Sequence, residues 1–251
     1  MKITVAIPTY NNLQQLEWCV NSLFKYTNHD DLQVVIVDNG GKGEVEKRLV
    51  FGDLPIKVIS ASDNLGWMKA INLVLNDCNT NYFCMLNDDV IFPPTASNFW
   101  GWLESQLKVR LHVNHKVVSV GPSSNFVAGP QSLMDLSTPL VFSTDVLIGF
   151  CLMIKTQILK DLGGLDKSLP GGDDFDLSIR LKEAGYNMHV DKRAYLHHIG
   201  QQTGNRVHEG FWDTSYHQEL VNNALIKKHN LEKWYKAFSM GWSEPIFKDA
   251  Q

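Results

Sequence analysis

The chain has 251 residues, of which 44% are hydrophobic and 20% charged, a balance that is typical of globular proteins and excludes a disordered one. Its net charge of −4 argues against an extended nucleic-acid-binding surface, which needs clustered Lys and Arg. Its four cysteines lie in apolar surroundings without a CxxC pair or metal-ligand spacing, which predicts buried thiols in a reducing compartment. The N-terminal residues lack the pattern of a secretory signal, and the longest apolar run, residues 146–154, is about half a membrane span. We therefore predict a cytoplasmic protein, soluble or at most peripheral.

Short β-branched runs alternate with amphipathic segments along the first half of the chain. The runs predict strands at residues 3–7, 33–37, 56–59 and 82–86. Helical spacing of apolar residues predicts helices at 16–24, 44–50 and 68–75, and Asn12 with Gln15 resembles a capping box for the first. This alternation indicates βαβ units. We expect an α/β fold with a doubly wound, mainly parallel sheet and helices on both faces.

The second half is less regular. It predicts strands at 117–120 and 147–154, separated by a polar stretch at 121–145, and helices at 174–184 and 214–229. No internal repeat, low-complexity tract or linker interrupts it, so residues 1–251 are expected to form a single domain.

Polar residues follow four consecutive strands of the predicted sheet. A parallel sheet binds ligands beyond the carboxyl ends of its strands, so these residues should share one edge. They are Pro8, Thr9 and Tyr10 after the first strand, Asp38 after the second, Asn64 and Gly66 after the third, and Asp88 and Asp89 after the fourth.

Each of these strand ends has a functional and a structural interpretation. Asp88 and Asp89 supply the oxygen ligands that Mg²⁺ or Mn²⁺ takes together with substrate phosphates, or they only begin a turn. Asp38 projects toward a ribose or a base, or likewise starts a turn. The ring of Tyr10 and the hydroxyl of Thr9 suit a nucleobase, although a plain turn also explains them.

Two further clusters lie in the second half. Asp173, Asp174 and Asp176 open a predicted helix, and three acidic residues are more than helix capping requires. Asp174 shares the inward side of that helix with two leucines, where it could act as a general base. His197 and His198 are either partly buried ring donors or metal ligands.

The ordered set of motifs resembles the inverting glycosyltransferases of family 2, which have the GT-A fold. The motifs are VAIPTYNN, VVIVDNGG, DNLGWMKAIN, MLNDDV, LGGLDKSLPGGDDFDLSIRLKEAGY and HHIG, and they extend from residue 3 to about residue 203. The resemblance implies transfer of a sugar from a nucleoside diphosphate sugar, UDP-linked by default, to a hydroxyl of a glycan or other acceptor. Residues 1–120 would form the nucleotide-sugar-binding half, and residues 121–251 the acceptor-binding half with the C-terminal helices.

The same resemblance implies a role for each candidate residue. The acceptor-side carboxylates would be Asp174 as catalytic base and Asp173, where the family has Glu, as an acceptor contact. The donor would be held by Pro8, Thr9, Tyr10, Asp38, Asn64, Gly66 and Asp88, and Lys69 would supply the positive charge for the phosphates. The metal, Mn²⁺ or Mg²⁺, would be bound by Asp89 and by His197, with His198 as the rival of His197.

Two other functions fit the same fold. A sugar-phosphate nucleotidyltransferase needs a Gly-rich, Arg-containing loop after the first strand, where this chain has PTYNNLQQ. A noncatalytic nucleotide-sugar or glycan-binding module would not need every acidic position. The aromatic and lysine residues at 231–242 either pack on the domain or contact a membrane surface at its periphery.

Overall fold

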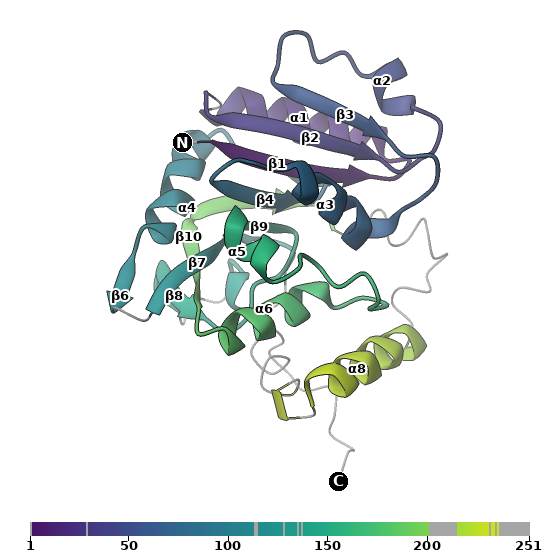
Figure 1. The fold of residues 1–251 in the computed structure, drawn as a ribbon. Helices are drawn as coiled ribbons and strands as arrows, with labels where there is room; N and C mark the ends of the chain where they lie inside the picture. Colours follow the sequence, from purple (N-terminus) through teal and green to yellow (C-terminus); the bar gives the residue numbers. More distant parts are fainter. Residues whose placement is uncertain are drawn as a thin grey trace.

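The computed structural model describes residues 2–28, 30–112, 115–127, 129–134, 136, 138–200, 215–230, 232, 233 and 235. The candidate membrane-contacting stretch at 231–242 therefore lies almost entirely outside the described residues. In chain order the elements are β1 (Ile3–Thr9), α1 (Leu13–Tyr26), β2 (Leu32–Asp38), α2 (Glu44–Arg48), β3 (Ile56–Ser60), α3 (Gly66–Asp77), β4 (Tyr82–Leu86), β5 (Val90–Ile91), α4 (Phe99–Leu107), β6 (Arg110–His112), β7 (His115–Ser124), β8 (Val141–Thr144), β9 (Cys151–Lys155), α5 (Thr156–Asp161), α6 (Asp173–Glu183), β10 (Asn187–His198) and α8 (Ser215–His229) (Figure 1).

The strands form one large mixed sheet in the order β3-β2-β1-β4-β9-β7-β10-β5. The first four are mutually parallel, as the βαβ pattern predicts. β9 then runs antiparallel to both β4 and β7, while β7 and β10 pair in parallel. The predicted α/β fold is confirmed, and the carboxyl ends of β1, β2, β3 and β4 share one edge of the sheet.

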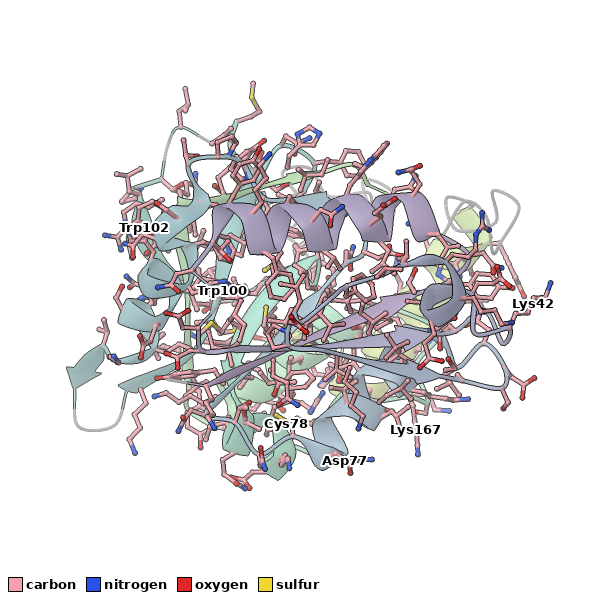
Figure 2. The ribbon with its side chains drawn as sticks, turned by 90° about the horizontal axis from the view of Figure 1, so that it is seen from above. Lys42, Asp77, Cys78, Trp100, Trp102 and Lys167 are labelled. Atoms are coloured by element: carbon pink, nitrogen blue, oxygen red, sulfur yellow. The ribbon has the colours of Figure 1, made fainter. Side chains whose placement is uncertain are left out.

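Side chains that alternate along the strands fill two cores, one on each face of the sheet. On β1, Val5 and Ile7 belong to the core that α1 and α4 cover, whereas Ala6 belongs to the core beneath α3, α5 and α6. Figure 2 shows α1 and Trp100 on one side of the sheet, and Cys78 at the end of α3 on the other. Helices therefore cover both faces, as expected.

The predicted strand at 147–154 is wrong over its first half. Only Cys151–Lys155 is a strand, because the amides of Leu147, Ile148 and Gly149 donate to side chains instead of a neighbouring strand. An apolar run alone does not distinguish these two uses of the backbone.

Two other local predictions need correction. Asn12 precedes α1, but its side chain donates to Asp88 and makes no cap to the helix backbone, so the capping box does not form. The polar stretch at 121–145 also contributes to the sheet, through the end of β7 and through β8.

Helix α8 packs against the start of α6 (Figure 1). A Cβ atom at Gly172 would lie 2.7 Å from Leu225 Cδ1 and 2.9 Å from Val221 Cγ1, so only glycine lets α8 approach this closely. Below this contact Asp176 is fully buried, with Lys228 Nζ at 2.6 Å and His229 Nε2 at 2.7 Å from its Oδ1. A charged cluster and an apolar contact thus join α8 to the α6 turn.

All four cysteines are free and buried, as predicted. No helix in the described part of the chain has both the length and the hydropathy of a membrane span.

Candidate functional site

The ends of β1 and β4 are joined through the side chain of Asp88. The Thr9 hydroxyl donates to Asp88 Oδ2 at 2.6 Å, and Asn12 Nδ2 donates to Asp88 Oδ1 at 3.1 Å. Asp88 is only 4% exposed. The short bond commits the hydroxyl of Thr9 to Asp88, so Thr9 acts on the site by holding that carboxylate in place.

Asp89, the next residue, faces the imidazole of His198 on β10. Asp89 Oδ1 lies 3.1 Å from His198 Nε2, and both side chains are buried. The other ring nitrogen, Nδ1, lies 2.8 Å from the carbonyl oxygen of Phe126, so Nδ1 carries a proton that it donates there. Asn87 Nδ2, at 3.3 Å from Nε2, can donate to the lone pair of that nitrogen.

This pair fits a divalent cation. Asp89 Oδ1 is buried without a hydrogen-bond donor among the described residues. Asp89 Oδ1 and His198 Nε2 attract each other only when a positive charge lies between them. That charge is either a second proton on the ring or a bound cation. An imidazole that donates its other N–H to a backbone carbonyl is the usual arrangement of a metal-ligating histidine. A cation would require the Asn87 amide to rotate away.

Two protein ligands match a metal that substrate phosphates complete. Across the described residues, no group of three or more His, Cys, Asp or Glu side chains converges as a metal site. Mg²⁺ and Mn²⁺ are commonly held by one or two protein ligands together with the phosphates of a nucleotide. Asp89 and His198 therefore fit a cation that arrives with its substrate.

The structure places His198, and not the expected His197, beside Asp89. His197 is exposed and, because neighbouring strand residues point to opposite faces, its ring lies on the side of β10 away from Asp89. His198 is instead stacked on Phe150, with ring centroids 5.2 Å apart, and its backbone N–H and C=O both bond the Asn125 side chain. These contacts fix the orientation of the His198 ring.

Asp38, at the end of β2, is 2% exposed and accepts two backbone hydrogen bonds. Gly40 N donates to Oδ1 at 2.9 Å, and Val45 N donates to Oδ2 at 3.2 Å. The carboxylate thus holds the loop into α2, which is the turn interpretation. Pro8 is buried and Tyr10 half-buried. Thr9, which lies between them, pairs with Asp38 across β1 and β2, so these strand-end residues are neighbours.

The third strand end is more open. Asn64 Oδ1 accepts from Gly66 N at 2.9 Å, and Gly66 adopts φ +72°, so the two residues form the tight turn that begins α3. Asn64, Gly66 and Lys69 are exposed. They are available to a ligand at the strand end.

Asp173 and Asp174 begin α6 and are held in different ways. Asp174 accepts from the backbone N–H groups of Phe175 at 2.8 Å and Gly149 at 3.3 Å. Asp173 Oδ2 accepts from Trp67 Nε1 of α3 at 3.0 Å. Since Gly149 directly precedes Phe150, one short segment contacts both Asp174 and the ring of His198.

The two carboxyls differ in acidity. Burial, and then the negative charge of Asp174, raise the pKa of Asp173 from 3.8 to about 7. Burial also raises the pKa of Asp174, and the backbone N–H groups of Phe175 and Gly149 offset only part of that rise. Asp174 therefore ionises first, and Asp173 retains its proton up to about neutral pH.

We expect Asp173→Asn to stabilise the protein at alkaline pH. Because the pKa of Asp173 is higher in the folded than in the unfolded chain, its stabilising contribution is present below about pH 4 and is lost as the pH rises through about 7. Removing the charge should raise Tm at pH ~8 by about 2–4 °C, as a gain of about 1 kcal/mol does in a chain of this length. The measurement is calorimetry at several pH values.

Asp166→Asn is the opposite control. Hydrogen bonds from Lys228 and Ser168 lower the pKa of Asp166, so the ionised carboxylate stabilises the folded chain. Replacing this carboxylate by an amide should therefore lower Tm at the same alkaline pH. If the Tm of Asp173→Asn at pH ~8 is equal to or below that of wild type, the pKa of Asp173 is not raised by burial in the folded protein.

Several contacts of the site were not predicted from the sequence. They involve Trp67, Asn125, Phe126, Gly149 and Phe150. Trp67 lies inside the DNLGWMKAIN motif, but nothing in the motif indicates a partner 106 residues away. Asn125 and Phe126 lie in a stretch without a recognisable motif, and Gly149 and Phe150 lie in the apolar run predicted as strand.

Residues 4–120 match the model of glycosyl transferase family 2. A pre-mycofactocin glycosyltransferase from Mycobacterium tuberculosis is 30% identical over 211 residues, which cover 78% of this chain and 42% of that protein. The chain belongs to glycosyl transferase family 2. It spans less than half the length of this family 2 relative.

Solved structures are similar to this chain in fold. The mannosyltransferase PcManGT from Pyrobaculum calidifontis, in complex with GDP-Man and Mn²⁺, gives a TM-score of 0.60 at 19% identity and covers 95% of this chain and 73% of that one. GalNAc-T7 with UDP, GalNAc and Mn²⁺ gives 0.66 at 15% identity and covers 96% and 55%. The chain thus has the GT-A fold that these metal-bound, nucleotide-binding transferases share.

Proposed function

We propose that this chain transfers a sugar from a nucleoside diphosphate sugar to an acceptor hydroxyl, with inversion at the anomeric carbon. The observation that carries the proposal is the segment at Gly149 and Phe150. It contacts Asp174 through a backbone N–H and His198 through a stacked ring, which supports a site shared by the carboxylate pair and the Asp89–His198 pair. Family membership supports the reaction class.

The donor would lie at the strand ends of the first half. Asp38, Pro8, Thr9 and Tyr10 would surround the nucleoside, and Asn64, Gly66 and Lys69 would lie nearer the diphosphate, with Asp88 toward the ribose and donor sugar. We propose UDP as the nucleotide by default. The complexes with GDP-Man and UDP in similar structures support a nucleoside diphosphate in general without choosing the base.

The acceptor side provides the proton chemistry. In the proposed reaction the acceptor oxygen forms a bond to the anomeric carbon while the bond from that carbon to the phosphate oxygen breaks. The hydroxyl proton passes to Asp174, which is the carboxyl of the pair that ionises first. Asp173 would hydrogen-bond the acceptor.

Asp89 and His198 would hold the divalent cation, and Asp88 would keep the adjacent strand end rigid. When bound, the cation supplies positive charge beside the diphosphate leaving group. The remaining acceleration would come from positioned side chains, because no covalent intermediate is needed.

We also propose that residues 1–251 act as one domain in the cytoplasm. A single sheet order that links both halves supports the first point. The second point rests on the sequence, whose four cysteines lack a CxxC pair or a metal-ligand spacing.

The test is a thermal-shift screen of UDP-, GDP- and dTDP-sugars with Mn²⁺, followed by an assay for released nucleoside diphosphate. A true donor should raise Tm by mass action, and release should increase when an acceptor is added. If none of these nucleotide sugars raises Tm or releases its diphosphate, the proposal is rejected. Stabilisation without release from any donor and acceptor pair would favour the noncatalytic binding module.

A further inference from the structure

The indole of Trp67 bridges the two halves of the site. Trp67 is the second residue of α3, and its Nε1–H donates to Asp173 Oδ2 of α6 at 3.0 Å, although the residues are 106 positions apart. An indole N–H only donates, so this contact is made to an acceptor and is strongest when that acceptor is ionised. The rest of the half-buried ring packs against the core beneath α3 and α6.

The position of Trp67 depends on the donor side of the site. It directly follows the turn in which Asn64 Oδ1 accepts from Gly66 N, and the positive φ of Gly66 turns the chain into α3. The turn therefore sets where the backbone of Trp67 enters α3.

Asp173 needs such a contact. It lies near Asp174 and Asp176, whose negative charges both disfavour its ionised form. Trp67 donates to one oxygen of this carboxyl, and so both orients it and favours its charged form. Asp174, by contrast, receives its donors from the backbone of Phe175 and Gly149 and does not depend on α3.

We propose that Trp67 is a positioning residue that orients Asp173 toward the acceptor. The role in catalysis rests on the proposed function. The contact between the indole and the carboxyl does not, and it is tested separately.

The first experiment uses the wild-type protein without ligand. In ¹H–¹⁵N spectra recorded between about pH 5 and pH 9, the Trp67 indole resonance should shift with a midpoint near the pKa of Asp173, which is raised to about 7. This shift should disappear in Asp173→Asn. Trp100 provides the matched control, because its Nε1 donates to the hydroxyl of Thr27, which does not titrate in this range. A Trp67 indole resonance that stays constant across the range overturns the proposal.

The second experiment uses Trp67→Phe, which keeps an aromatic ring but removes the donor. Carboxyl ¹³C titration should show the pKa of Asp173 raised by about half a unit to one unit, as expected for loss of one hydrogen bond. Trp18→Phe, at an exposed tryptophan on α1, should leave it unchanged. An unchanged pKa of Asp173 in Trp67→Phe, or an equal change in Trp18→Phe, would sink the idea.

The third readout is kinetic. With the donor that wild type turns over, Trp67→Phe should raise the acceptor KM and lower kcat/KM for the acceptor roughly tenfold, while donor affinity stays within about twofold. Equal losses on the donor and acceptor sides would show a general structural defect and contradict the positioning role. If wild type releases no nucleoside diphosphate, the proposed function fails while the spectroscopic result still decides the contact.

Discussion

Asp174→Asn should lose most transfer activity while keeping the fold and donor binding. The substitution removes a proton acceptor with little change in shape, and the amide oxygen can still accept from Gly149 or Phe175. A positioned base contributes roughly a hundred- to ten-thousand-fold, so kcat should fall by that range. The measurement is kcat at saturating donor and acceptor, with donor Kd from calorimetry.

Asp173→Asn is the matched comparison for this experiment. It changes the neighbouring carboxyl, which we place at the acceptor, so its main effect should be on the acceptor KM. If Asp174→Asn transfers sugar within a few-fold of wild type, or if Asp173→Asn alone loses the chemical step, Asp174 is not the base.

Donor binding should require a divalent cation and should depend on Asp89 and His198. Asp89→Ala should abolish cation-dependent donor binding, because it removes the charged ligand whose Oδ1 lies buried without a donor. His198→Ala should weaken it by roughly 10- to 100-fold and narrow the advantage of Mn²⁺ over Mg²⁺, since Mn²⁺ tolerates imidazole better. Calorimetric titration of the donor with each metal measures both effects.

His197→Ala is the matched control for the metal site. Its ring is exposed on the other face of β10, so donor binding should remain close to wild type. A large loss in His197→Ala with little loss in His198→Ala would return the metal contact to His197. Full activity in excess chelator would remove the cation from the mechanism.

The sequence predicted the fold better than it predicted the contacts of the site. Periodicity located the four parallel strands of the first half, because β1, β2 and β4 have apolar side chains on both buried faces. It did not predict α4 at Phe99–Leu107. The prediction of a strand at 147–154 was wrong over its first half, because backbone N–H groups there donate to the side chains of Ser178, Gln131 and Asp174. The hydrophobicity of a segment does not indicate such hydrogen bonds.

The same limit applies to the histidine pair. Adjacent strand residues point to opposite faces, so one of His197 and His198 had to face away from Asp89, but the register of β10 decides which. That register depends on the pairing of β10 with β5 and on the hydrogen bonds of the Asn125 side chain to the His198 backbone. Both partners lie far from β10 in sequence. Trp67 shows the complementary case, since its motif was recognised while its partner was not.

The packing of α8 on Gly172 sets the shortest fragment of this chain that we expect to fold stably on its own. A fragment that ends after β10 would expose Phe175 and Ile179 and would leave Asp176 buried with Arg180 but without Lys228 and His229. The turn that carries Asp173 and Asp174 would lose its packing contact with α8. Shortened versions intended for crystallography or screening should therefore extend through His229.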